Sequence, residues 1–259
     1  MVAERSEGPC GTTEGLRGER EILRCAQDDK SEELTALLLH FDLVDDAPQI
    51  RHFKEADLDA CYAISLATGH AGADASQLYR DPKMMGHIYI APYVLLEPGL
   101  AWIVEDRDGV AGFVAGVVDT AAWEERLERD WWPALRRRYA DPVHVPPGEQ
   151  TADQRRASMI HHPVPTPVEI ATRYPAHLHM NLLPRLQRRG AGSLLLGIWL
   201  SAARARGALS FHVGVNRMNR GALRFWSAQG FSALAPKPGI ESRTCWMGCD
   251  LPPGNQVIV

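Results

Sequence analysis

The strongest structural signal in this 259-residue chain lies in the stretch His177-Leu178-His179-Met180-Asn181-Leu182-Leu183-Pro184-Arg185-Leu186-Gln187-Arg188-Arg189-Gly190-Ala191-Gly192. The pattern predicts a strand over 177–183 and a long helix with an apolar face over 190–206, ended by a glycine. Two glycines separated by one residue let the main chain turn tightly between them. The N-terminus of the helix then presents unpaired N–H groups and the positive end of its dipole, which suits a pyrophosphate. A Gly-x-Gly turn can also serve only to start a helix, so both interpretations stay open at this point.

A second strand and helix follow at regular spacing, over 209–215 and 219–229, and two short strands over 231–234 and 243–251 close the chain. Strand, helix, strand and helix in this order predict a parallel strand pair joined by a right-handed crossover. A ligand crevice is expected where the two strands part.

The upstream half predicts an antiparallel meander with two helices. Its expected elements are a strand over 50–53, a helix over 54–69, strands over 87–90, 100–105 and 110–118, and a helix over 121–139 that Pro133 kinks or divides. The turn Asp106-Arg107-Asp108-Gly109 marks the last two strands as a hairpin. Residues 141–175 hold seven of the 18 prolines, so a long lid-like loop is expected there.

Composition indicates an ordinary soluble globular protein, with 45% apolar and 23% charged residues and a net charge of −4. This excludes a collagen, a coiled coil, a wholly disordered chain and a small disulfide scaffold. Charge is uneven along the chain: residues 1–47 hold 5 Lys+Arg against 12 Asp+Glu, whereas residues 170–240 hold ten Lys+Arg and no acidic residue. A basic segment around a phosphate-type turn favours a polyanionic ligand over a solvated basic face or a nucleic-acid patch.

Several functions are not expected. No apolar stretch has the roughly 20 residues of a membrane span and no signal peptide is visible, so we expect a cytoplasmic protein without membrane contact. The five cysteines are scattered and predict reduced thiols, with neither a disulfide framework nor a metal site. We expect residues 1–47 to be an acidic extension, disordered over 1–18 with one or two short helices within 19–40. Residues 48–259 are expected to form the folded domain, with a long insertion at about 120–175.

The stretch Leu182-Leu183-Pro184-Arg185-Leu186-Gln187-Arg188-Arg189-Gly190-Ala191-Gly192 resembles the acetyl-CoA signature of the GCN5-related N-acetyltransferases, Arg/Gln-x-x-Gly-x-Gly/Ala. Downstream, Asn219-Arg220-Gly221-Ala222-Leu223-Arg224-Phe225-Trp226, followed by Gly230-Phe231, resembles the family's second signature, Asn-x-x-Ala-x-x-Phe-Tyr with a closing Gly-Phe. Residues 174–184 and the long connection before them are most similar to bacterial relatives of the acetyltransferase-like domain of O-GlcNAc hydrolases. The resemblance implies an α/β (α+β) fold with a mostly antiparallel central sheet flanked by helices, and a splayed parallel strand pair at the cofactor site.

The resemblance also assigns cofactor-binding residues. It implies that main-chain groups of Leu182 and Leu183 pair with the pantetheine arm of acetyl-CoA, and that Asn219 caps the last helix near the thioester. The N–H groups of the turn would hold the pyrophosphate, with charge from two arginines; the residues are Gln187, Arg188, Arg189, Gly190, Ala191 and Gly192.

Direct attack by an amine on the thioester needs a base for the amine proton and an acid for the thiolate. His177, His179 and Asn181 alternate on one strand face, so either histidine is a candidate base, although both also fit a packed structural role. Asp119 is a second candidate, as base or amine anchor. The family's acid is the Tyr of Phe-Tyr, and Trp226 stands in its place; an indole N–H is too weak an acid to replace it. Trp226 is instead expected to bind the cofactor by covering the pantetheine.

The resulting hypothesis is an acetyl-CoA-dependent N-acetyltransferase that acts on the primary amine of a small-molecule or amino-sugar-like acceptor. A catalytically weak or inactive CoA-binding or protein-interaction module of the same fold is the alternative, because of Trp226. Binding to nucleic acid is not expected, and the oligomeric state is left open, a homodimer included.

Overall fold

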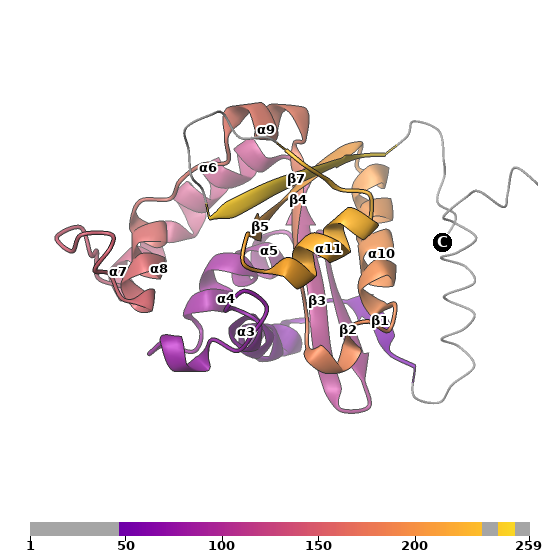
Figure 1. The fold of residues 1–259 in the computed structure, drawn as a ribbon, viewed down its shortest axis with the longest axis horizontal. Helices are drawn as coiled ribbons and strands as arrows, with labels where there is room; N and C mark the ends of the chain where they lie inside the picture. The colour runs from indigo at the N-terminus through magenta and orange to yellow at the C-terminus, as the bar shows by residue number, and fades with distance from the viewer. Residues whose placement is uncertain (1–46, 235–242, 252–259) are drawn as a thin grey trace, which may run out of the picture.

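The computed structural model describes residues 47–234 and 243–251, which fold around a seven-stranded sheet of order β1-β2-β3-β4-β5-β7-β6 (Figure 1). The strands are β1 (Gln49–His52), β2 (Ala101–Asp106), β3 (Gly109–Val117), β4 (Ala176–Leu182), β5 (Ser210–Asn216), β6 (Ser232–Ala233) and β7 (Thr244–Asp250). Among these described strands β4 and β5 are the parallel pair, and every other neighbouring pair is antiparallel. The mixed, mostly antiparallel sheet confirms the expected fold class. The predicted features of residues 1–46 lie outside the described residues.

Helices cover both faces of the sheet. They are α3 (Leu58–Ala67), α4 (Met84–Tyr89), α5 (Ala91–Leu96), α6 (Thr120–Asp130), α7 (Trp132–Arg138), α8 (Ala152–His161), α9 (Val168–Arg173), α10 (Ala191–Ala205) and α11 (Arg220–Ala228). Four short 3-10 helices join them: η1 (Glu55–Asp57), η2 (Ser76–Leu78), η3 (Pro98–Leu100) and η4 (Pro184–Leu186). Figure 1 shows α10 on one side of the strands and α3 to α5 on the other.

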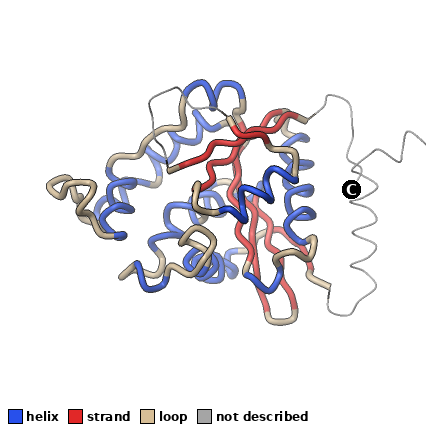
Figure 2. Tube along the Cα trace, in the orientation of Figure 1, coloured by secondary structure: helices blue, strands red, loops and turns tan. Residues whose placement is uncertain are grey.

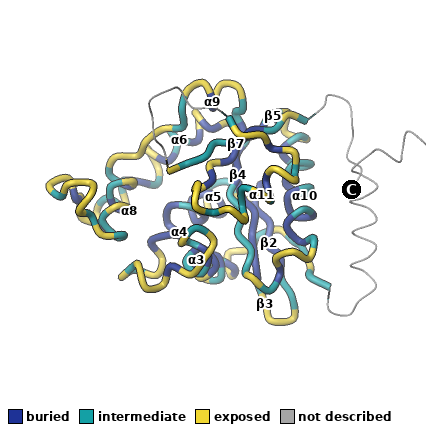
Figure 3. The backbone as a smooth tube through the Cα atoms, in the orientation of Figure 1, coloured by how far each residue is buried: buried dark blue, intermediate teal, exposed yellow. Residues whose placement is uncertain are grey.

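The strands divide their side chains between two apolar cores, because successive residues point to opposite faces. Trp102 and Val104 of β2 pack in the core with α10, whereas Ile103 packs in the core with α3 to α5. Figure 3 shows the central strands as the most deeply buried part of the chain. The Asp-Gly turn joins β2 and β3 as a hairpin, as predicted. Figure 2 shows the end of this hairpin beyond the helices. The sheet is thus a rigid support from which β4 and β5 carry the site.

Two predicted elements are wrong. The strand expected over 87–90 is the end of α4, whose residues from Met84 to Ile88 are all buried. An apolar run that is buried on every side does not distinguish a strand from a helix by periodicity. The loop expected over 141–175 instead contains α8 and α9. The helix expected over 121–139 is divided at Trp131 into α6 and α7, with Pro133 in the first turn of the second helix.

The parallel pair separates soon after it begins. Paired positions are Ala176 with Phe211 and His177 with His212, and no described residue further along β4 pairs with β5. The two strands therefore leave an open gap inside the sheet from about residue 178 onward. This gap is where a ligand could bind to main-chain groups.

Candidate active site

The gap between β4 and β5 is lined by main-chain groups that make no strand-to-strand hydrogen bond, although the carbonyl of Leu182 accepts from Gln187 Nε2 at 2.9 Å. The N–H of Leu183 donates to the carbonyl of Ala111, which places the odd-numbered residues of β4 in hydrogen bonds with β3. Because these bonds alternate along a strand, the N–H and C=O groups of Met180 and Leu182 face the gap. Leu182 was predicted to line the cofactor site, and Met180 was missed.

Leu183 does not join that lining. Its N–H is used by Ala111, and its carbonyl accepts from the N–H of Leu186 at 3.0 Å. On the other side of the gap, β5 makes its hydrogen bonds to β7 through its odd-numbered residues. The bonds just beyond its two ends show this: the carbonyl of Leu209 accepts from the N–H of Leu251, and the N–H of Arg217 donates to the carbonyl of Arg243. Gly214 therefore presents its main chain to the gap from the opposite edge.

The turn after β4 has the geometry of an anion-binding nest. Arg188 and Gly190 both have positive φ, 59° and 82°, and α10 begins directly after them. Within the described chain, the N–H groups of residues 188–193 donate to no main-chain carbonyl. Successive free N–H groups in such a turn converge on one point and bind anions. A pyrophosphate fits this arrangement.

The packing beneath the turn is close at Gly192. A Cβ on Gly192 would meet Leu182 Cδ1 and Phe225 Cε2, both at 3.2 Å. A Cβ at this position would require the side chains of Leu182 and Phe225 to shift by a few tenths of an ångström. Gly192 therefore allows the turn, the strand and the last helix to approach one another.

The charge around the turn is smaller than the sequence suggests. Three of its ten basic residues form ion pairs with carboxylates from outside the segment: Arg173 with Asp250, Arg185 with Asp106, and Arg206 with Glu97. Arg188 and Arg189 are exposed and pair with no carboxylate in the described part of the chain. Positive charge is therefore left at the turn itself.

The second signature lies on α11. Asn219 caps this helix, its Oδ1 accepting from the N–H of Ala222 at 3.0 Å, as predicted. Its side chain also lies beside Gly72, where a Cβ would be 3.1 Å from Asn219 Nδ2. Trp226 is buried, with its ring 5.0 Å from that of Phe231. The indole N–H of Trp226 donates to no described residue.

A chain of hydrogen bonds joins the two β4 histidines on the face that carries α3 to α5. Thr120 Oγ1 donates its one proton to the carbonyl of Pro175 at 2.7 Å, so it can only accept from His177 Nδ1, also at 2.7 Å. A neutral His177 then accepts at Nε2 from the Tyr93 hydroxyl at 2.8 Å. The Tyr93 oxygen in turn accepts from His179 Nε2 at 3.2 Å.

This chain fixes the tautomer of His179. With its proton on Nε2, the ring keeps a lone pair on Nδ1, which bonds to no described residue and is not sealed from solvent. Burial lowers the pKa of His179 to about 4 and that of His177 well below its usual range. Both rings are therefore neutral at pH 7. His177 has both nitrogens occupied, which is a structural role, and His179 has a free basic nitrogen.

The buried histidines predict a loss of stability in mild acid. Burial also lowers the pKa of His87 to about 4, whereas an unfolded histidine titrates near 6.5. Below about pH 6.5 the histidines of the unfolded chain bind protons, whereas the buried rings of the folded chain stay neutral. The free energy of unfolding is therefore highest above about pH 6.5 and falls toward pH 4. The slope is up to about 1.4 kcal/mol per pH unit for each ring. Urea unfolding at pH 7, 6 and 5 measures it; an unchanged free energy of unfolding between pH 7 and 5 would contradict it.

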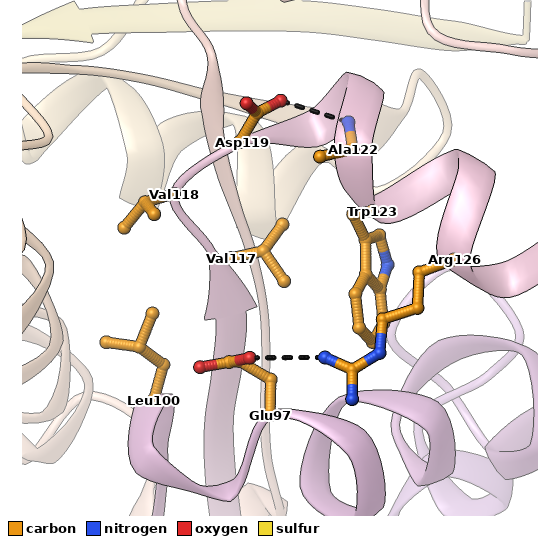
Figure 4. A pocket seen from close by; sticks show the side chains of 8 residues that line it. All are labelled: Glu97, Leu100, Val117, Val118, Asp119, Ala122, Trp123 and Arg126. Carbon is orange, nitrogen blue, oxygen red and sulfur yellow. Dashed lines mark hydrogen bonds and ion pairs between the residues drawn. The ribbon is translucent and has the colours of Figure 1, made fainter.

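Asp119 lies away from the gap. Its carboxylate caps α6 by accepting from the N–H of Ala122 at 3.0 Å. Figure 4 shows it on the wall of a cavity of about 190 Å³, where Glu97 and Arg126 form an ion pair. This cavity is at the paired end of β4 and β5, since the N–H of Thr120 bonds to Pro175 just before β4. The geometry favours His179 over Asp119 as the base.

Some site residues were not found in the sequence. Tyr93 and Thr120 are 84 and 57 positions from His177. Only the pairing of β3 with β4 and the packing of α5 bring them together, and no local pattern marks them. Within the described residues no group of three or more His, Cys, Asp or Glu side chains could hold a metal ion. No described helix is long and apolar enough to cross a membrane.

Comparisons with known proteins agree with this geometry. No family model matches the chain. The crystal structure of SsHAT is 34% identical, covering 78% of this chain and 98% of that one, with a TM-score of 0.70. Protein O-GlcNAcase from Rattus norvegicus is 19% identical over 174 residues, 66% of this chain. The chain spans only 19% of the length of that relative.

More distant solved structures match as well. One is yncA, a putative acetyltransferase from Salmonella typhimurium solved with its cofactor acetyl-CoA, which is 18% identical over 81% of this chain and 96% of that one, with a TM-score of 0.45. The splayed strand pair, the nest and the two signatures define a CoA-type acyltransferase fold. The chain belongs to the GCN5-related N-acetyltransferase family, whose acyl donor is acetyl-CoA.

Proposed function

We propose that this protein is an acetyl-CoA-dependent N-acetyltransferase that acts on the primary amine of a small-molecule or amino-sugar-like acceptor. One observation carries the proposal: a single gap between β4 and β5 starts beside the buried histidines and ends at the nest. The main chain of β4 can thus bind the phosphate-bearing arm of a ligand, and the same strand positions the free imidazole nitrogen of His179.

The residues present fit acetyl-CoA. Main-chain groups of Met180 and Leu182 would hold the pantetheine arm, and the N–H groups of residues 188–193 would hold the pyrophosphate. Arg188 and Arg189 add charge there, and the indole ring of Trp226 would cover part of the arm. When bound, acetyl-CoA supplies an activated acyl carbon.

The chain's own groups would then move one proton and stabilise one charge. His179 Nδ1 takes the proton of the attacking amine, and the Tyr93 oxygen stabilises the imidazolium through Nε2. A main-chain N–H of β4 that faces the gap would donate to the oxygen on which negative charge develops. No acid is placed at Trp226, so water would protonate the leaving thiolate.

A non-catalytic CoA-binding module of the same fold is the second candidate, and Trp226 is the observation that favours it. Losing a positioned acid typically costs roughly 10²–10⁴-fold in rate. An inactive protein could keep every group that holds the cofactor. Binding and turnover must therefore be measured separately.

Calorimetry with acetyl-CoA, followed by release of free thiol with a panel of amines, separates these candidates. We expect saturable binding and thiol release that depends on the amine. Binding without amine-dependent thiol would overturn the enzyme and support the module. Absence of acetyl-CoA binding would overturn both.

A further prediction concerns the missing acid. Trp226→Tyr should raise kcat, because it restores a phenol where the family has one, while Trp226→Phe, which lacks the hydroxyl, should not. Steady-state thiol release on both variants tests this. Equal kcat in Trp226→Tyr and wild type would show that no acid is lacking at this position.

A further inference from the structure

One half-buried arginine beside the histidines has no carboxylate partner. Arg156 of α8 donates from Nε to the Tyr79 hydroxyl at 3.2 Å and from one Nη to the Tyr89 hydroxyl at 2.8 Å. That same nitrogen also contacts Met159 Sδ at 3.0 Å. Within the described residues no Asp or Glu pairs with it. A guanidinium removed from water without a counter-charge costs free energy unless a ligand supplies one.

Other arginines of the same insertion are neutralised. Arg136 pairs with Glu128, and Arg138 pairs with Asp81 at 2.8 Å. Arg137 and Arg155 also lack a carboxylate in the described chain, but both are exposed to solvent. Among the half-buried arginines of the described insertion, Arg126 and Arg136 each pair with a carboxylate and Arg156 does not. Such a difference within one insertion points to a partner that is not part of the described chain.

The guanidinium keeps a free edge. Its second Nη group donates to no described residue and is not a buried unsatisfied atom, so it is open to solvent. The hydroxyls of Tyr79 and Tyr89 hold the other nitrogens and fix the plane. An arginine held in this way presents donors in the geometry that suits carboxylate and phosphate oxygens.

Tyr89 connects the guanidinium of Arg156 with the candidate base. The Tyr89 ring lies 5.3 Å from the Arg156 guanidinium carbon and 5.7 Å from the centroid of the His179 ring. Arg156 and His179 therefore lie beside the same aromatic ring. A small molecule could place its amine at His179 and an anionic group at Arg156.

We propose that the acceptor is a small amine that also carries a carboxylate or phosphate group, which Arg156 binds. The inference rests on the proposed function, because it places the acceptor amine at His179. It narrows the acceptor from any amine to an anionic one and makes Arg156 a specificity-determining residue.

Matched acceptor pairs test the inference. Each pair differs only in the anionic group: β-alanine and its amide, 4-aminobutyrate and its amide, and glucosamine 6-phosphate and glucosamine. We expect kcat/KM to be about tenfold to a hundredfold higher for the anionic member of at least one pair, mainly through a lower KM. The carboxylate and phosphate pairs show which oxyanion is preferred. Equal values within every pair would overturn the proposal.

Variants locate the effect. In Arg156→Gln the ratio between anionic and neutral members should fall toward one, and Arg156→Lys, which keeps the charge but loses the fork, should be intermediate. Arg155→Gln, on the exposed side of the same helix, should keep the wild-type ratio. Thermal unfolding checks that α8 stays folded, and Arg156→Lys is used alone if the glutamine variant does not fold. A ratio unchanged by either Arg156 substitution would overturn the proposal.

A binding measurement separates this inference from the proposed function. Calorimetry of the same pairs with the CoA-bound protein needs no turnover. Anionic members that bind more tightly, with a preference lost in the Arg156 variants, would support the Arg156 site even if no thiol is released. Equal binding of both members would overturn it, whether or not the protein is an active enzyme.

Discussion

Gly190→Val should weaken acetyl-CoA binding by about a hundredfold or more and leave the chain folded. Gly190 has φ of 82°, a conformation that a β-branched residue avoids, and it lies in the middle of the nest. Valine would move toward negative φ and turn the neighbouring N–H groups away from their common point. Losing two hydrogen bonds to a charged group, at about 1.5–3 kcal/mol each, accounts for a change of that size.

The other end of α10 provides a matched control. Gly207 has φ of 89°, and a Cβ added there meets nothing within 4 Å. Gly207→Val therefore imposes similar backbone strain on the same helix, far from the gap. Calorimetry should show normal acetyl-CoA binding in Gly207→Val and the weakened binding in Gly190→Val alone. Equal affinities in the two variants would remove the pyrophosphate from this turn.

The sequence predicts the fold best where local chemistry alone determines it. The Asp-Gly hairpin, the Gly-x-Gly turn and the Asn219 cap each depend on a few neighbouring residues, and all three appear as expected. The helix over 152–161 was missed because prolines flank it. Its start was nevertheless marked by Thr151 and Gln154, which form a capping box.

Tertiary contacts decide the rest of the fold. The residues at the end of α4 form a short apolar run that fits a strand as well as a helix. They are helical where the segment packs against α3 and α8, and Ile88 and Ile90 both lie in one core. Propensity is a weak guide in such places.

The candidate site follows the same division. The turn and the α11 cap are local, and the sequence located them. Whether His177 or His179 is the better candidate base depends on Thr120 and Tyr93. These residues come from other elements, and their hydrogen bonds decide which ring nitrogen of each histidine carries the proton. The sequence also overestimated the unpaired positive charge of the basic segment, because Asp106 and Asp250, which lie outside it in the sequence, form ion pairs with two of its arginines.

His179→Gln should lower kcat by a factor of about 10²–10⁴, while the dissociation constant of acetyl-CoA stays unchanged. Glutamine can still donate from its amide to the Tyr93 oxygen, so the structural hydrogen bond is kept, but it cannot take a proton. The cofactor would be held by the main chain of β4 and by the turn, neither of which the substitution alters. Thiol release at saturating acceptor, together with calorimetry, measures both quantities.

Tyr93→Phe tests the role of Tyr93, which positions the base His179 but does not itself take the proton. It removes the acceptor for His179 Nε2–H, so the imidazole can take either tautomer and part of the population no longer presents a lone pair on Nδ1. The loss in kcat should therefore be smaller than in His179→Gln, and the acid limb of the pH–rate profile should move. That limb lies low in the wild type, because burial holds the pKa of His179 near 4. If kcat in His179→Gln stays within twofold of wild type, the proton leaves the amine by another route and His179 only packs against Tyr93.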